Sequence, residues 1–454
     1  MAFRMHDRKV YFALETTEGT RVAPNASTGY VQSVDPTFTV TNRMYERNPT
    51  RLAVTPVMQI TPGTGRSSGA PSATIEFSFS VEMAGSGTLG TAPRWSSLLK
   101  ACGMKEVAVS SNALTGIMLG GTAARFMRNY ENFSAQAGTA YASGTQTGRV
   151  IGDTAYDDTT LYYKLDDTGS TAIADTNKLV GQSSGVYATA SGTSTATGGL
   201  AYVMTSGTAL GGEARAGSDD SSLTIQMVVN SSGDYIEGVG CRGNVEFAFT
   251  SGDSVKMNFT FTGRLNQYAE GGTFTPTADT EDIPPAFTGV SLGIAESTYG
   301  ASDVSAYTST IFNTMNVNIS NEITVRENVD TSSGYDVAFI TGRSPSMTFN
   351  PDAVRVATAG NNADFWDRFL SGETTRARLT VGSDAGNKFL FRMPACQFTG
   401  VTDGNRDEVM VLDSTTTLTG GDYGSSVQDR TDGADSTTTN ERLGTDNEFV
   451  FYAL

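Results

Sequence analysis

The sequence predicts an all-β protein with two short helices, built as two tandem β-sandwich or barrel domains with a small β-domain inserted into the first. Three observations predict this organisation: alternation of apolar and polar residues, two helical segments that each stop at a glycine, and short strings that occur twice in the same order. With 38% apolar residues and 50 glycines in 454, the composition is that of a folded chain rather than a disordered one.

Alternation predicts most of the strands. In segment 73–81, isoleucine, phenylalanine and valine occupy every second position, with glutamate and serine between them. Segments 245–249 and 255–261 alternate in the same way on either side of a Ser-Gly-Asp connection. A period of two with a glycine-containing connection is typical of a half-buried antiparallel hairpin. Segments 315–319 and 448–452 are expected to be strands for the same reason.

Two segments favour helices. Residues 93–102 precede Gly103, and residues 362–370 precede Gly372. Each contains a tryptophan four positions before a leucine, which places both on one helical face. A glycine immediately after such a segment is a common helix stop, because it adopts the left-handed conformation of a C-terminal cap.

The chain contains an internal repeat. Thr-Gly-Arg-Ser occurs twice, each time shortly before a Pro-Ser-x-Thr-apolar string, and the two tryptophans follow in the same order. Equivalent positions lie 277 residues apart at the arginines, 271 at the tryptophans and 155 at the cysteines. Chance is the alternative for any single string, whereas an ordered series favours duplication. The repeat anchors are Arg66 and Arg343, Trp95 and Trp366, Gly103 and Gly372, and Cys241 and Cys396.

The fall in spacing predicts an insertion of about 116 residues in the first copy, between its helix and its cysteine. The inserted stretch is rich in Gly, Ser, Thr and Ala, yet it contains strand-like pieces, so a small surface β-domain is favoured over disorder. Residues 429–447 are acidic and poor in apolar residues, which predicts a long exposed loop. The expected boundaries are 1–112 and 219–285 for the first domain, 113–218 for the insert, 286–300 for a linker and 301–454 for the second domain.

The anchors are expected to be structural rather than chemical. A tryptophan on a short amphipathic helix is more often a core residue than a ligand platform, so Trp95 and Trp366 are both expected to fill the core. Cys241 and Cys396 are expected to be small buried apolar groups rather than reactive thiols.

Charge and composition exclude several functions. The net charge is −17, so a basic face that grips nucleic acid is excluded, although an acidic wall past which nucleic acid slides is not. His6 is the only histidine, and three distant cysteines make neither a disulfide framework nor a zinc site. We expect no metal, no cofactor and no enzymatic activity, with a carboxylate pair of the glycosidase type as the alternative left open. No apolar run is long enough to span a membrane, and no secretory signal is expected.

Several motifs carry a family resemblance. The Glu15–Thr20 segment followed by Pro24, the block Pro93–Gly103 and the hairpin strings of 238–263 are similar to segments of bacteriophage tail tube proteins. The strings 340–345 and 446–450 resemble parts of the second half of such proteins. Asp253 stands where the family usually has glutamate, and the insert and residues 429–447 have no assigned counterpart.

The resemblance implies a structural virion protein without enzymatic activity. Its two similar halves would let three chains build a pseudo-hexameric ring, and stacked rings would form an acidic conduit for genome ejection. Expected partners are other copies of the chain, the tail terminator, tape-measure and distal-tail proteins, and double-stranded DNA in transit. The expected location is the phage tail, assembled in the host cytoplasm, with the insert on the outside. The alternative is another virion β-protein, such as a capsid decoration protein or a glycan-binding adhesin.

Overall fold

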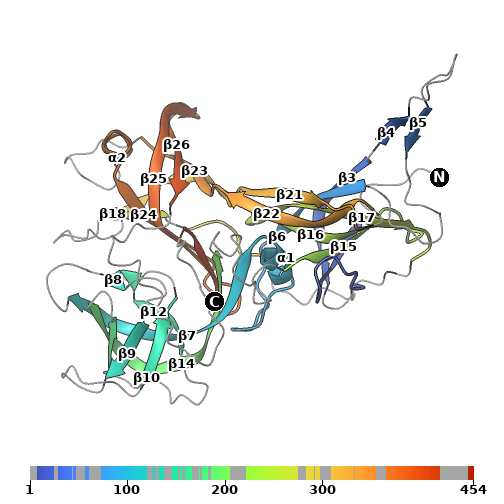
Figure 1. Ribbon diagram of the computed structural model, residues 1–454. Coiled ribbons are helices and arrows are strands. Elements are labelled where there is room, and N and C mark those ends of the chain that lie inside the picture. Colours follow the sequence, from blue (N-terminus) through green and yellow to red (C-terminus); the bar gives the residue numbers. More distant parts are fainter. Residues whose placement is uncertain are drawn as a thin grey trace.

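The all-β class with two short helices is confirmed (Figure 1). The strands form one large antiparallel sheet system and three two-stranded sheets. The structure is a computed structural model that describes residues 8–24, 29–42, 44–47, 57–60, 73–119, 126–127, 132–136, 146–151, 154–155, 159–165, 173, 176–181, 186–204, 221–272, 274, 283–290, 292–296, 308–331, 333–353, 364–419 and 448–454.

Six antiparallel strands form the sheet of the first half, in the order β3-β6-β17-β16-β15-β1. The alternating segments pack one face inward, because buried residues, most of them apolar, occupy every second position along β6 and the first part of β17. The short β2 pairs with β1, and β4 pairs with β5 in a separate hairpin. The strands are β1 (Lys9–Leu14), β2 (Tyr30–Val31), β3 (Ser33–Asn42), β4 (Met44–Arg47), β5 (Val57–Ile60), β6 (Ala73–Glu82), β15 (Leu223–Val228), β16 (Tyr235–Thr250) and β17 (Lys256–Ala269).

The second half repeats that order strand for strand, as β20-β23-β26-β25-β24-β18. A hairpin, β21–β22, connects β20 to β23 in the same place where β4–β5 connects β3 to β6. The internal repeat is therefore a property of the fold as well as of the sequence. The strands are β18 (Leu292–Glu296), β19 (Thr308–Thr310), β20 (Phe312–Asn318), β21 (Asn321–Glu327), β22 (Tyr335–Arg343), β23 (Ser346–Pro351), β24 (Thr374–Val381), β25 (Phe389–Arg406), β26 (Val409–Leu418) and β27 (Val450–Ala453).

The segment 286–300 does not behave as the predicted linker. It contains β18, which pairs with β24 just as β1 pairs with β15. Phe287 is also buried and packs its ring 5.3 Å from that of Phe249. The second unit therefore begins before residue 301. A repeated string marks this start, since Glu15-Thr-Thr-Glu-Gly after β1 has a counterpart in Glu296-Ser-Thr-Tyr-Gly.

The inserted segment forms a small β-unit with its own core of aromatic and aliphatic residues. Its two long strands, β7 and β14, pair along most of their length, and β14 also pairs with β27 of the second half. Figure 1 shows β9, β10 and β12 set apart from the two halves. The strands are β7 (Met104–Leu119), β8 (Phe126–Met127), β9 (Asn132–Gln136), β10 (Gln146–Val150), β11 (Thr154–Ala155), β12 (Thr160–Leu165), β13 (Lys178–Gly181) and β14 (Val186–Met204). The predicted loop 429–447 lies outside the described residues.

The two helices differ in the residue that each buries. In α1 (Ser96–Ala101), the preceding Trp95 is fully buried and its indole N–H donates to the carbonyl of Ala84 at 2.7 Å. In α2 (Phe365–Ser371), Trp366 is 42% exposed, and Phe365 lies in the core instead.

The expectation that both tryptophans fill the core is thus wrong for Trp366. The Asp364 carboxylate accepts the N–H of Asp367 and caps the helix, so the first helical residue is Phe365. Its ring packs 5.7 Å from that of Phe349. A helix buries one stripe, and here the phenylalanine takes that position and turns the tryptophan outward.

Replacing each tryptophan by alanine should give unequal results. Trp95→Ala removes a fully buried ring and leaves the Ala84 carbonyl without its donor, so we expect a loss of about 3–5 kcal/mol in unfolding free energy. Trp366→Ala should cost less than about 1 kcal/mol in the dissociated chain, because the side chain is half exposed. Urea unfolding followed by circular dichroism measures both, and equal losses would contradict the assigned burial.

Candidate assembly interface

Among the described strands, the pairing of β16 with β20 joins the two halves edge to edge. The second part of β16 pairs with β20 from Glu246 opposite Asn318 to Thr250 opposite Thr314. Alternate residues on both strands are buried, including Phe247 and Val317. The sheet therefore runs from one half into the other without an interruption, and a single apolar core lies beneath it.

The hairpin β21–β22 packs over the first half. Figure 1 shows it lying along β16 and β17. Val337 of β22 fits against two glycines with positive φ, Gly19 at 68° and Gly240 at 62°. A Cβ atom would lie 2.7 Å from Cγ1 of Val337 at Gly19 and 2.9 Å from it at Gly240. Glycine is required at both positions, by the backbone conformation and by the close approach of the hairpin.

Buried charge supports the same contact. The Arg242 side chain is fully buried and donates through Nη2 to Oε1 of Glu18 at 2.8 Å and through Nη1 to the carbonyl of Ala338. Its guanidinium also lies 5.4 Å from the ring centre of Phe339. A buried guanidinium is costly unless it is paired and hydrogen-bonded. The hairpin therefore complements the surface beneath it in the first half, which we call the platform and which includes Gly19, Gly240 and Arg242.

An asparagine fixes the start of the hairpin. The amide of Asn321 donates to the carbonyl of Cys102 at 2.8 Å, at the end of α1, and to the carbonyl of Gly243 at 2.9 Å. Its backbone N–H donates to Oδ1 of Asn244 at 3.0 Å. These bonds tie β21 to both the helix and β16, so the hairpin has one position on the first half.

A carboxylate organises the neighbouring loop. Glu15 accepts the N–H groups of Gly19 at 2.7 Å and Gly240 at 2.9 Å, and the hydroxyls of Ser222 at 2.6 Å and Thr224 at 2.9 Å. A carboxylate can accept four such bonds because it carries two oxygens with two lone pairs each. The bonds hold the loop and its Gly19 against β16, where Val337 packs.

A fully buried carboxylate lies nearby. Glu237 is fully buried and accepts from Nε of Arg21 at 2.8 Å, from the amides of Gln226 and Asn266, and from Gln267 at 3.2 Å. These partners and those of Glu15 come from segments far apart in the chain. No sequence pattern singles out Glu237 or Arg242, and Glu15 is marked only as part of the Glu15–Thr20 string.

The repeat anchors have structural surroundings and are not brought together into one site. Gly103 and Gly372 end the two helices with φ of 81° and 68°. Cys241 and Cys396 are buried, and Arg343 forms an ion pair with Glu448 at 2.8 Å. Arg66, like His6, lies outside the described residues.

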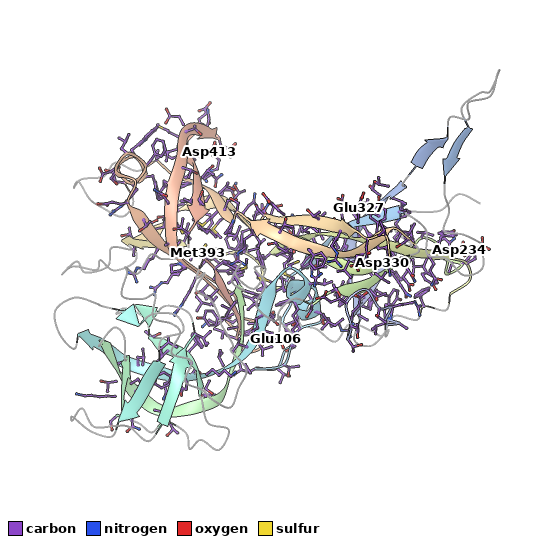
Figure 2. The ribbon with its side chains drawn as sticks, viewed as in Figure 1. Glu106, Asp234, Glu327, Asp330, Met393 and Asp413 are labelled. Atoms are coloured by element: carbon purple, nitrogen blue, oxygen red, sulfur yellow. The ribbon has the colours of Figure 1, made fainter. Side chains whose placement is uncertain are left out.

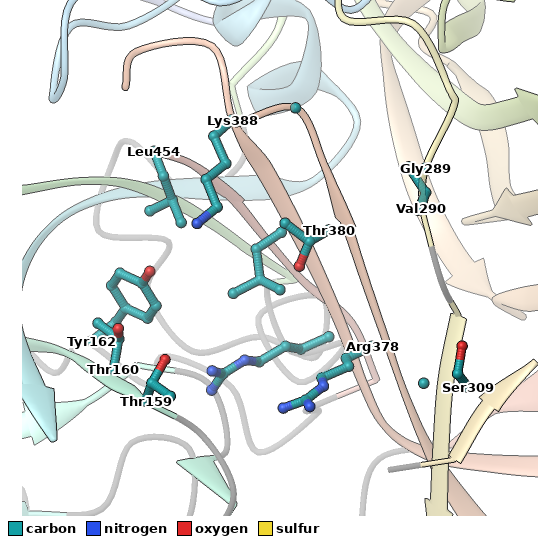
Figure 3. A pocket seen from close by; sticks show the side chains of 14 residues that line it. Thr159, Thr160, Tyr162, Gly289, Val290, Ser309, Arg378, Thr380, Lys388 and Leu454 are labelled. Carbon is teal, nitrogen blue, oxygen red and sulfur yellow. The ribbon is translucent and has the colours of Figure 1, made fainter. Parts of the chain in front are cut away.

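Basic residues line a cleft between the insert and the second half (Figure 3). The cleft has a volume of about 500 Å³, and Arg378 and Lys388 face Thr160 and Tyr162 across it in Figure 3. Arg392 also lines the cleft. The Arg392 guanidinium lies 5.9 Å from the ring centre of Tyr162. These contacts make the cleft part of the seam that holds the insert in place.

The acidic residues labelled in Figure 2 lie on separate parts of the molecule. Figure 2 shows Asp413 on β26, Asp234 at the far end of the first half and Glu327 and Asp330 on the β21–β22 hairpin. Among the described residues, no group of three or more His, Cys, Asp or Glu side chains could hold a metal ion. In that same part of the chain, no helix is long and apolar enough to cross a membrane.

Comparison with known protein families finds no match, and comparison with curated proteins finds none either.

Replacing Glu15 by glutamine tests the loop. The amide has one oxygen where the carboxylate had two, and its NH₂ group faces donors, so we expect about 1–3 kcal/mol lower unfolding free energy. Glu270→Gln is the control because its side chain is exposed. Equal urea midpoints for the two variants would show that the four hydrogen bonds contribute nothing measurable.

The cysteines should resist modification in the folded chain. Burial raises the pKa of Cys396 from 9.0 to about 12, and it raises the pKa values of Cys102 and Cys241 as well. We expect no reaction with a thiol reagent at pH 8 in the native state and three labelled thiols after denaturation. Because the unfolded thiols ionise first, the unfolding free energy should fall as pH rises from 9 towards 12. Rapid labelling of the native chain would contradict the burial.

Proposed function

We propose that this protein is a structural, non-enzymatic subunit of a bacteriophage tail tube that assembles with copies of itself into stacked rings. The observation that carries the proposal is the β16–β20 pairing between two halves with the same strand order. A contact that joins the first half to the second within a chain can also join the second half of that chain to the first half of the next. Such head-to-tail contacts close into rings.

The edges needed for this contact are present in both halves. The counterpart of β20 is β3, which among the described residues pairs only with β6. The counterpart of the second part of β16 is the end of β25, where residues 401–406 pair only with β26 in the described chain. Sheet edges with unpaired N–H and C=O groups favour pairing with another strand. Pairing β3 of one chain with β25 of its neighbour would extend the sheet from chain to chain.

Three chains joined in this way present six similar sheets around a central channel. The sheet face opposite the core carries polar residues, among them Glu76, Ser78 and Thr260, and the whole chain has a net charge of −17. An acidic, polar wall repels phosphate and lets DNA pass without binding. This is the chemistry that a conduit for genome ejection needs. The insert, which lies apart from the two halves in Figure 1, would then project from the outer wall.

The remaining partners in this proposal follow from the family resemblance of the sequence motifs. They are the tail terminator and distal-tail proteins at the tube ends and the tape-measure protein within the tube. The location is the phage tail, after assembly in the host cytoplasm. The alternative function is that of a capsid decoration protein or a glycan-binding adhesin. For either, we expect isolated globular particles rather than tubes.

The interchain register can be inferred from the repeat. Ala248 of β16 pairs with Lys256 on one side and opposes Asn316 of β20 on the other. Thr402 of β25 pairs with Asp413. Asp413 lies 157 residues beyond Lys256, which is also the spacing between the Thr-Gly strings at 262–263 and 419–420. Thr402 is therefore equivalent to Ala248. The Thr-x-x-Val-x pattern aligns Asn316 with Thr39 of β3. Thr39 of one chain is therefore expected opposite Thr402 of the next, and both side chains are exposed in the single chain.

Electron microscopy of the purified protein should show rings or tubes. In the double variant Thr39→Cys/Thr402→Cys, a short bismaleimide should join neighbouring chains, because opposed residues on paired strands lie about 5 Å apart. Denaturing electrophoresis should then show a ladder that ends at three chains for a three-chain ring. Each single variant is the control and should remain a monomer band. Rings without a ladder would contradict the strand pairing, and globular monomers would contradict the function itself.

A further inference from the structure

Within the described part of the chain, the β4–β5 hairpin does not pack along another sheet as its equivalent does. Its equivalent, β21–β22, lies along the first half, whereas Figure 1 shows β4–β5 projecting away from the folded body. The two hairpins share a cross-strand register, because Met44 opposes Ile60 just as Ile323 opposes Ile340. The string Val-x-x-Ile-Thr also begins at Val57 in one and at Val337 in the other.

The second half contains the corresponding platform. The cysteine repeat places Ala395 and Gln397 of β25 where β16 has Gly240 and Arg242. Ala395 is small, like the glycine against which Val337 packs, and is buried in the single chain, whereas Gln397 is exposed. Its amide donates to the carbonyl of Gly372 at 3.3 Å, so this platform adjoins the end of α2.

The end of α2 is also apolar and uncovered. Leu370 is 77% exposed and Trp366 is 42% exposed, and they share one helical face because they are four positions apart. The matching end of α1 is buried, and there the carbonyl of Cys102 accepts from Asn321 at the start of β21. Exposed tryptophan and leucine side chains next to the exposed Gln397 favour a protein contact.

We propose that the β4–β5 hairpin of one chain docks on Trp366, Leu370 and Gln397 of the neighbouring copy, as β21–β22 docks on the first half of its own chain. The repeated Val-x-x-Ile-Thr string gives Val57 the place in this hairpin that Val337 has in β21–β22. This inference rests on the proposed ring assembly, which it supplies with a second contact beside the strand edge. The partner is a second copy of this chain.

Tryptophan accessibility tests the docking in the wild-type protein. Trp95 is fully buried, so acrylamide quenching of the dissociated chain should report mainly Trp366. On assembly, the quenching constant should fall at least threefold and the emission maximum should move to shorter wavelength. Rings in which Trp366 remains as quenchable as in the single chain would overturn this docking while leaving the ring assembly intact.

The variant Val57→Glu tests the hairpin itself. A carboxylate in an apolar contact is costly, so we expect at least tenfold weaker association by analytical ultracentrifugation. The matched control is Val329→Glu at the tip of the β21–β22 hairpin, where the side chain is 98% exposed, and it should associate like the wild type. An unchanged urea midpoint for Val57→Glu shows that the chain still folds. Wild-type association of Val57→Glu would overturn the docking, and a wild-type chain that forms no rings at all would overturn both this inference and the proposed function.

Discussion

The pairing of β16 with β20 is the contact on which the architecture depends. It converts two separate sheets into one continuous sheet, and it aligns the apolar faces of both halves over a common core. Each hydrogen bond between the two strands replaces hydrogen bonds to water, and the side chains of Phe247 and Val317 are buried beneath the pair. Once this edge is joined, the position of the β21–β22 hairpin over the first half follows, because β21 begins three residues after β20 ends.

The hairpin contact covers one buried charge, Arg242, and a second, Glu237, lies in the neighbouring network of the first half. Arg242 and Glu237 are both fully buried, and each has partners from more than one segment. Removing one partner from such a group leaves an uncompensated charge, which costs far more than losing a surface ion pair. The loop after β1 therefore has to be in place before the hairpin can pack, and Glu15 holds it there. The network gives the contact a defined geometry rather than a large apolar area.

Much of the fold could be predicted because it depends on local patterns. Alternation identified the β6, β16 and β17 strands, and the repeated strings indicated that the second half copies the first. The helix phase could not be predicted from six or seven residues, since both Phe365 and Trp366 fit an amphipathic pattern and only the Asp364 cap decides between them. The five residues of β18 include a glycine and are too short to show a clear alternation, so the sequence alone predicts a linker there. The charged network could not be predicted from the sequence, because its partners are distant in the chain. Glu15 and Gly240, like Arg21 and Glu237, lie more than 200 residues apart.

Only one of the two halves carries the insert, and this asymmetry has a consequence for any larger assembly. The strands that would line a channel repeat in the same order in both halves, whereas β7–β14 occur once per chain and are anchored by β27. A ring of three chains would therefore have a wall of near-sixfold symmetry and an exterior of threefold symmetry. A protein docking on the rim of such a ring would meet six similar edges, and one that recognises the outer surface would find three sites.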